Sequence, residues 1–178
     1  MSRKLVFGLG NPGDEYIKTR HNIGARFVEE YLKYKEEDIN LTSNTKLSSK
    51  IAVLDDVIFG VPLDVFMNDS GKPVRKCADF FKIYPQNILI IHDDADLPFG
   101  KIKSGKGCGG GHHGAFSVNK SFGKKIKRIR IGVWPGDRPA GVRRISSFVL
   151  NNFSDEEELN MNEVFGNFRL ALEEFLES

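Results

Sequence analysis

The sequence predicts an α/β protein in which one sheet is flanked by helices, and three observations lead to this prediction. Short apolar runs typical of buried strands recur along the chain. Segments whose apolar residues fall at helical spacing lie between these runs. The length of 178 residues and the apolar share of 40% suit one core, so we expect a single domain over residues 1–178.

A glycine-rich turn joins the first predicted strand to the first predicted helix. Residues 4–7 are apolar and run into glycines, as in a buried strand that ends in a tight turn. Apolar residues at helical spacing follow the turn, so a helix begins near Asn22. His21 therefore lies at a helix N-terminus, where the dipole disfavours the imidazolium form and keeps the ring available as a general base.

The middle of the chain predicts a loop, a hairpin, a helix and a central strand. The polar stretch 35–50 indicates a loop, and the apolar runs 51–54 and 57–61 indicate two strands joined by a turn. A helix follows through residues 74–81. Residues 87–92 are continuously apolar, which predicts a central strand covered on both faces. Carboxylates follow at 93–96, where open α/β sheets place functional groups.

The last part of the chain predicts a loop, two helices, a strand and one ambiguous element. Residues 101–106 are basic and loop-like, and a glycine-rich loop then opens a helix through 115–122. Residues 128–133 alternate between basic and apolar, which predicts a half-exposed strand with a positive outer face. Residues 145–150 fit either a strand or a loop. Residues 155–176 predict one amphipathic helix with acids in its first turn.

Positive charge is concentrated in one part of the chain. Residues 100–144 hold twelve lysines and arginines and one acid, a charge of +11, so the rest carries −9 of the net +2. A solvated basic face is the ordinary explanation of a lysine run. A segment this one-sided in an otherwise acidic chain is better explained by a polyanion, so we expect a nucleic-acid partner whose phosphates it binds.

Two other ligand classes fit parts of the sequence less well. Residues 8–13 match the GxGxxG dinucleotide pattern, but the helix does not open on the last glycine, and no acidic residue closes a second strand at the required distance. Asp94 and Asp96 beside His92 resemble a divalent-cation site, yet no further ligands accompany them. We therefore expect neither a nucleotide cofactor nor a metal.

The expected location depends on two kinds of sequence feature, targeting segments and cysteines. We find no charged-then-apolar leader and no apolar run near eighteen residues, so we expect neither secretion nor membrane insertion. Cys77 and Cys108 do not have metal-ligand spacing and fit a reducing compartment. A cytoplasmic protein is expected.

Several motifs in one order resemble the bacterial-type peptidyl-tRNA hydrolase family, and the resemblance covers essentially the whole chain. The matching pieces are Gly8-Leu9-Gly10-Asn11-Pro12-Gly13 with Tyr16, Thr19-Arg20-His21-Asn22-Ile23-Gly24, Phe66-Met67-Asn68 with Ser70-Gly71, His92-Asp93 with Asp96-Leu97-Pro98, Gly110-Gly111-His112, Arg128-Ile129-Arg130-Ile131-Gly132 and Phe148-Val149-Leu150. No single piece is specific, whereas the ordered set is.

The resemblance implies hydrolysis of the ester that joins a peptide to the 3′ ribose of tRNA. It also implies a three-layer α/β/α fold around a mixed, twisted sheet, a monomer without an obligate protein partner, and water as the only co-substrate. His21 would activate water, and Asp93 would accept its other ring N–H. Asn11 and Asn68 would bind the peptide backbone and the ester carbonyl.

The resemblance also assigns the contacts to tRNA. Tyr16 and Phe66 would contact the terminal nucleotide, and Met67 would line the substrate site beside Asn68. The basic segment, including Lys103, Lys106 and Arg130, would hold the acceptor-stem phosphates. These residues complete the predicted substrate site.

One residue departs from the family pattern. The glycine-rich loop of the family ends His-Asn-Gly, whereas this chain has His112-His113-Gly114, so His113 replaces an asparagine that positions substrate and water. An imidazole cannot donate and accept from the geometry of an amide. We therefore keep a second hypothesis, an RNA-binding relative with weakened or lost catalysis. A third explanation is that His113 lines a loop without a role.

Overall fold

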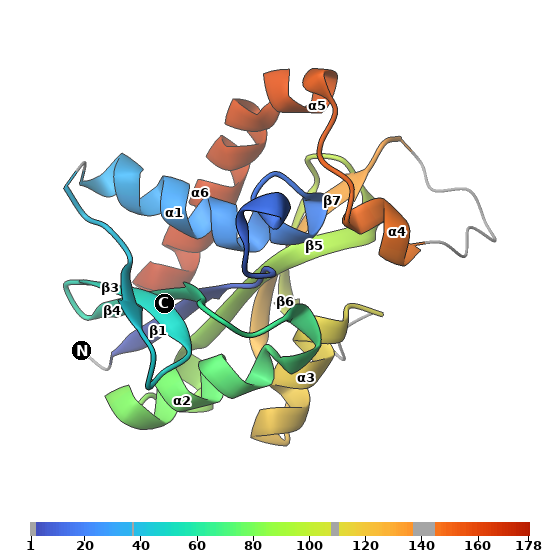
Figure 1. Cartoon of the computed structure of the whole chain (residues 1–178). Helices are drawn as coiled ribbons and strands as arrows, with labels where there is room; N and C mark the ends of the chain where they lie inside the picture. The colour runs from blue at the N-terminus through green and yellow to red at the C-terminus, as the bar shows by residue number, and fades with distance from the viewer. Residues whose placement is uncertain (1–2, 37, 108–110, 137–144) are drawn as a thin grey trace.

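The computed structural model describes residues 3–36, 38–107, 111–136 and 145–178. They form a seven-stranded sheet with helices on both faces (Figure 1). The strands are β1 (Lys4–Gly8), β2 (Thr42–Asn44), β3 (Ser49–Leu54), β4 (Val57–Pro62), β5 (Ile88–Pro98), β6 (Ile102–Lys106) and β7 (Lys127–Trp134). The helices are α1 (Ile23–Lys35), α2 (Gly71–Phe81), α3 (His113–Phe122), α4 (Ile145–Val149), α5 (Asp155–Leu159) and α6 (Met161–Glu177).

The sheet is mixed, with its parallel part in the centre. The strand order is β2-β3-β4-β1-β5-β7-β6, and β1 runs parallel to both β4 and β5. β5 is parallel to β7, whereas β2, β3 and β4 pair antiparallel and β6 is antiparallel to β7. The continuous apolar runs of β1 and β5 suit strands buried on both faces. The predicted α/β fold is confirmed.

Two helical layers cover the sheet and define two halves of the core. α1 and α6 cover one face through a cluster that includes Phe27, Phe168 and Leu172. α2 and α3 cover the other face, where Val74 and Val118 are fully buried (Figure 1). None of the described helices has the length and apolar character needed to cross a membrane.

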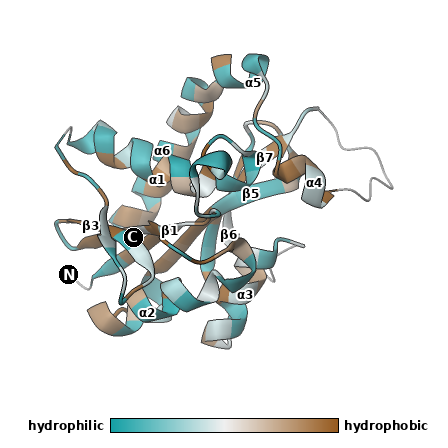
Figure 2. Cartoon of the chain, in the orientation of Figure 1, coloured by the Kyte–Doolittle hydropathy of each residue, from teal (hydrophilic) through white to brown (hydrophobic). Residues whose placement is uncertain are grey.

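The central strand β5 is longer than the sequence indicates, and this extension positions the site. We expected the strand to end at His92, yet it continues to Pro98 and changes from hydrophobic to hydrophilic along its length (Figure 2). Its second half pairs with β7, with Asp93 opposite Ile131 and Pro98 opposite Trp134, and the register is irregular between Asp94 and Pro98. β1 ends at Gly8, opposite Ile91, so the polar half of β5 has a strand neighbour on one side only.

Two stretches expected to be loops contain edge strands. Residues 42–44 form β2 within the predicted 35–50 loop, and residues 102–106 form β6 rather than a basic loop. Both strands are largely exposed and pair with one neighbour each. Polar edge strands lack the apolar alternation by which strands are recognised in a sequence.

The C-terminal third differs from expectation at two helices. Residues 145–149 form the helix α4 and not a strand or loop, and the guanidinium carbon of Arg20 lies 4.4 Å from the ring centroid of Phe148 in this helix. The predicted helix 155–176 is divided at Asn160 into α5 and α6. Ser154 and Glu157 form a reciprocal capping box that starts α5 as a separate short helix.

Candidate active site

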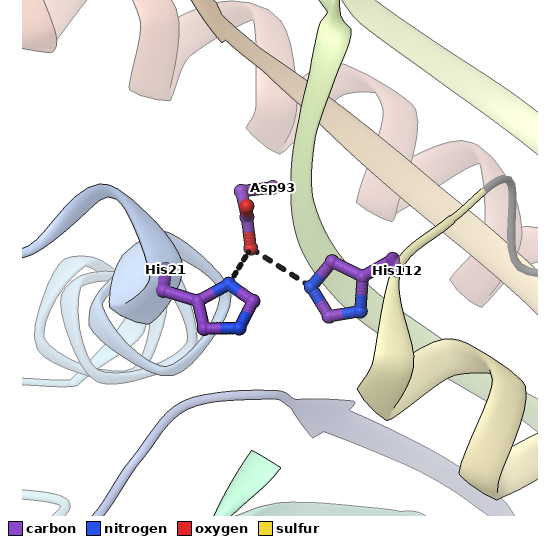
Figure 3. A group of neighbouring side chains, drawn as sticks. All are labelled: His21, Asp93 and His112. Carbon is purple, nitrogen blue, oxygen red and sulfur yellow. Dashed lines mark hydrogen bonds and ion pairs between the residues drawn. The ribbon is translucent and has the colours of Figure 1, made fainter. Parts of the chain in front are cut away.

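The site is centred on a histidine from the turn before α1 and an aspartate from the central strand β5. His21 lies in a short 3-10 turn, η2 (Arg20–Asn22), that leads directly into α1. Its Nδ1 is 2.8 Å from Oδ1 of Asp93 (Figure 3). An ionised carboxylate only accepts hydrogen bonds, so Nδ1 carries the proton and donates it. The lone pair of neutral His21 is then on Nε2, which points away from Asp93 in Figure 3.

A second histidine donates to the same carboxylate oxygen. His112 is the N-cap residue of α3, and its Nδ1 accepts the backbone N–H of Ala115 at 3.2 Å. Its Nε2 therefore carries the proton, and it donates to Asp93 Oδ1 at 2.9 Å. The motif Gly110-Gly111-His112 is part of the family resemblance, but the sequence analysis predicts no role for His112. Its position immediately before a helix, where polar side chains cap the first turn, is the feature that could have identified it.

The Asp93 carboxylate is buried and ionised. Asp93 is only 2% exposed. Burial alone raises the pKa of the Asp93 carboxyl, but the rings of His112 and His21 outweigh burial and hold the pKa well below its usual range. The carboxylate can therefore orient His21 and stabilise an imidazolium formed there during a reaction.

The same three side chains resemble a metal site by spacing. The ligand atoms of His21, Asp93 and His112 lie within 4.8 Å of one another. However, the ring nitrogens that face the carboxylate both carry protons and donate them, so a cation between them would have to displace two hydrogen bonds. The arrangement fits a hydrogen-bonded acid–base group better than a metal centre.

The carboxylates after Asp93 are used locally. Oδ1 of Asp94 accepts the backbone N–H of Asp96 at 2.9 Å, and Oδ2 of Asp94 accepts Nη1 of Arg130 at 3.1 Å. Asp94 thus closes a turn and holds an arginine. These contacts give Asp94 a structural explanation that requires no cation.

A pocket of about 620 Å³ opens over this group and collects most of the predicted site. Among the residues predicted from the sequence, it is lined by His21, Asp93, Asn11, Tyr16, Phe66, Met67, Asn68 and His113. Tyr16 and Phe66 meet edge to face, with ring centroids 6.1 Å apart, and Phe66 is 56% exposed. An exposed aromatic pair beside a pocket can stack on a nucleobase.

Asn11 is held so that one polar group faces the pocket. Its Oδ1 accepts the backbone N–H of Met67 at 2.8 Å. Within the described part of the chain, its Nδ2 makes no hydrogen bond, although Asn11 lines the pocket. This amide can therefore donate to a substrate oxygen.

One wall of the pocket was not predicted. α4 and the residue after it contribute Ile145, Ser146, Val149 and Leu150. The family resemblance includes Phe148-Val149-Leu150, but it predicts no position for these residues in the site. Only the tertiary structure brings this helix beside η2, where Arg20 donates to the carbonyl oxygen of Asn152 at 2.7 Å.

Two of the predicted basic residues of β6, Lys103 and Lys106, lie on different faces of the sheet. Lys103 of β6 is opposite Arg130 of β7, and Arg130 reaches the pocket rim through Asp94. Lys106 is opposite Lys127, whose ammonium lies 5.1 Å from the ring centroid of Phe175 in α6. Side chains alternate along a strand, so Lys103 and Lys106 occupy opposite faces of the sheet.

The expectation of a positive outer face on residues 128–133 is wrong for one of its two arginines. Arg128 is buried, with 7% of its surface exposed, and its guanidinium packs against the backbone of Gly107. Arg130 remains partly exposed. Other basic residues of the segment, Arg138, Arg143 and Arg144, lie outside the described residues.

Comparison with known proteins identifies the family. A family model described as peptidyl-tRNA hydrolase matches residues 5–178. The chain is 41% identical over 165 residues to a peptidyl-tRNA hydrolase of Lactobacillus gasseri, covering 91% of this chain and 86% of the relative. It is 40% identical over 181 residues to a peptidyl-tRNA hydrolase of Malacoplasma penetrans, and the match covers 99% of this chain and 92% of that relative.

A solved structure agrees with this assignment. The structure of peptidyl-tRNA hydrolase from Acinetobacter baumannii matches with a TM-score of 0.80 and 34% identity, covering 92% of this chain and 83% of that protein. Both the sequence and the fold are therefore shared over nearly the whole chain. The chain belongs to the peptidyl-tRNA hydrolase family.

Proposed function

We propose that this protein hydrolyses the ester between a peptide and the 3′ ribose of tRNA and so releases tRNA for reuse. The observation that carries the proposal is the 2.8 Å contact between His21 Nδ1 and Asp93 Oδ1 beneath the pocket. This contact leaves the second ring nitrogen of His21 as a base. Family membership indicates which ester the activated water attacks.

The reaction begins with water in the pocket. His21 Nε2 takes a proton from the water as its oxygen attacks the ester carbonyl carbon, and the charge of Asp93 stabilises the imidazolium that forms. The carbonyl oxygen becomes an oxyanion, to which the Nδ2 amide of Asn11 can donate. When the tetrahedral intermediate collapses, the ribose 3′ oxygen leaves and takes the proton from the imidazolium. The products are a peptide carboxylic acid and tRNA with a free 3′ hydroxyl.

The pocket residues account for the two ends of the substrate. Tyr16 and Phe66 bind the terminal nucleotide by stacking, and Met67 and Asn68 line the part of the pocket that receives the peptide. His113 lines the same pocket from the start of α3.

The phosphates of the acceptor stem bind outside this pocket. Arg130 and Lys103 share a sheet face beside the rim and contact the phosphates. Lys106 lies on the other face of β6, so its contribution is a longer-range electrostatic one.

The same proposal covers the co-substrate, the assembly and the location. Water is the only co-substrate, no metal or organic cofactor takes part, and the protein acts as a monomer in the cytoplasm, where tRNA is used. The alternative of a non-catalytic RNA-binding relative gains no support from the site, because His21, Asp93 and Asn11 all line one pocket.

Single-turnover cleavage of an N-acetyl-aminoacyl-tRNA tests the proposal. Wild type is expected to release the tRNA, and His21→Ala is expected to lose roughly 10²–10⁴-fold in rate, the usual contribution of a general base. The tRNA affinity of His21→Ala should stay within about threefold of wild type, since the substitution removes no phosphate contact. Equal cleavage by the two proteins, or none by wild type, would refute the proposal.

A further inference from the structure

A third histidine lies behind the catalytic group and is not used by the mechanism above. His92 is 1% exposed and precedes Asp93 in β5. Its ring centroid lies 4.3 Å from that of His112, at an interplanar angle of 46°. His112 in turn lies 4.9 Å from His21 by the same measure, so the three imidazoles form a row from the core to the pocket.

The end of β1 explains what His92 binds. The N–H of Leu9 donates to the carbonyl oxygen of Ile91 at 2.9 Å, at the point where β1 ends at Gly8. Backbone groups alternate along a strand, so the next carbonyl on that side belongs to Asp93 and points past the end of β1. His92 supplies the missing donor, because its Nδ1 is 2.6 Å from the Asp93 carbonyl oxygen.

This hydrogen bond fixes the tautomer of His92. A carbonyl oxygen only accepts, so Nδ1 carries the proton. The Nε2 atom is buried and has no hydrogen-bond partner among the described residues. Burial, with His112 and Arg128 nearby, lowers the pKa of His92 well below its usual value, while the adjacent Asp93 only partly opposes this effect. The ring is therefore a neutral donor.

We propose that His92 is a positioning residue of the active site. It holds the Asp93 peptide group by its carbonyl oxygen, so that the N–H groups of His21 and His112 converge on one carboxylate oxygen. The catalytic effect of this role rests on the proposed hydrolase function. The role itself is a statement about hydrogen bonding that can also be measured without turnover.

Three substitutions separate the hydrogen bond from the ring. His92→Asn keeps an N–H donor at the position of Nδ1 and removes the ring, whereas His92→Phe keeps a ring and removes the donor. His92→Gln is the matched control, because it carries the same amide one bond further out and cannot reach the Asp93 carbonyl in the same way. Thermal unfolding of each variant sets a temperature at which all are folded.

We expect His92→Phe and His92→Gln to lose about 10- to 100-fold in kcat with KM within about threefold, as for a small displacement of catalytic groups. His92→Asn should recover most of this loss. If the rates of the three variants followed only their melting temperatures, and asparagine did not rescue activity, the inference would be overturned. The proposed hydrolase function would be unaffected by that result.

A spectroscopic measurement tests the inference even if wild type proves inactive. Long-range ¹H–¹⁵N spectra distinguish the tautomers of each histidine. At pH 7, His92 is expected to be neutral with its proton on Nδ1, and His112 with its proton on Nε2. A proton on Nε2 of His92 would exclude the hydrogen bond to Asp93 and overturn the inference, whereas inactivity of wild type with the expected tautomers would refute only the hydrolase proposal.

Discussion

Asn22 holds Asn11 by two reciprocal hydrogen bonds. The backbone N–H of Asn11 donates to Oδ1 of Asn22 at 2.9 Å, and Nδ2 of Asn22 donates to the carbonyl oxygen of Asn11 at 2.9 Å. Asn22 directly follows His21 in η2 and is buried. One turn of chain therefore positions both the base and the amide expected to face the oxyanion.

The first prediction concerns this clamp. Asn22→Ala leaves the Asn11 backbone groups without their partners and should destabilise the protein by about 1–3 kcal/mol. It should also lower kcat about tenfold or more, because the Asn11 amide is no longer held in place. Urea unfolding and steady-state kinetics measure the two effects. Asn22→Asp, which retains the acceptor for the Asn11 N–H, should fall between wild type and Asn22→Ala, and a kcat unchanged in Asn22→Ala would contradict the clamp.

The second prediction concerns a buried ion pair next to His21. Arg20 Nη2 lies 2.6 Å from Oε2 of Glu157, and each side chain is 9% exposed. The pair links η2 to α5. Glu157→Ala should cost about 3–5 kcal/mol of folding stability, since it leaves a buried guanidinium without its carboxylate.

The double variant Arg20→Met/Glu157→Leu provides the control for this pair. Nε of Arg20 and Oε1 of Glu157 are buried without hydrogen bonds among the described residues, so the ions are not fully compensated. Replacing both by apolar groups should therefore cost much less than the sum of the single changes. Denaturant unfolding of wild type, Arg20→Met, Glu157→Leu and the double variant completes the cycle, and additive effects would argue against a coupled pair.

The third prediction concerns His113. It is exposed at the first position of α3, and within the described residues it makes no hydrogen bond, ion pair or ring contact. His113→Asn should therefore change kcat by less than about fivefold, equivalent to about 1 kcal/mol in the barrier. Single-turnover rates across pH test this. If His113→Asn gained activity more than tenfold, the histidine would be a defect in the site.

The fourth prediction separates the two faces of β6. Arg130→Ala should weaken tRNA binding and reduce the slope of log affinity against log salt by about one, as expected for one lost phosphate contact. Lys106→Ala should weaken binding less than Arg130→Ala and leave the slope nearly unchanged, because Lys106 shares the sheet face of Lys127 and α6 and acts on the phosphates only at longer range. Binding titrations at several salt concentrations compare the two variants. Equal loss of slope in both would place the phosphates over both faces.

Sequence patterns predicted the buried parts of the fold, although β5 continues past Asp93 to Pro98 instead of ending at His92. β1, β5 and the amphipathic helices α1, α2 and α3 have apolar spacing that their burial requires. His21 and Asp93 could be located beside a helix start and a strand end. Their pairing came from the family resemblance, since two residues separated by 72 positions carry no local indication of contact.

The remaining features depend on tertiary contacts that no local pattern records. α4 is a five-residue helix that lies against Arg20, and β2 and β6 are polar edge strands. Basic and apolar residues alternate along β7, a pattern that predicts an exposed Arg128, yet Arg128 is buried beside Gly107. His112 donates to the carboxylate of Asp93, which lies 19 positions away in the sequence, so the motif around His112 does not indicate this role.

Cleavage by the Asp93→Asn variant tests the central claim most directly. The pKa of Asp93 is held below its usual range, so its ionised form stabilises the fold above about pH 4 and this contribution is lost only as pH falls further. A loss of wild-type activity between neutral pH and about pH 4 therefore could not come from protonation of Asp93. Asparagine keeps the shape and removes the charge that fixes and stabilises the His21 ring.

Single-turnover cleavage by Asp93→Asn should be at least about 10³-fold slower than by wild type at neutral pH, with tRNA affinity nearly unchanged. A variant that cleaved within about tenfold of wild type would show that the contact between His21 and Asp93 does not drive the reaction.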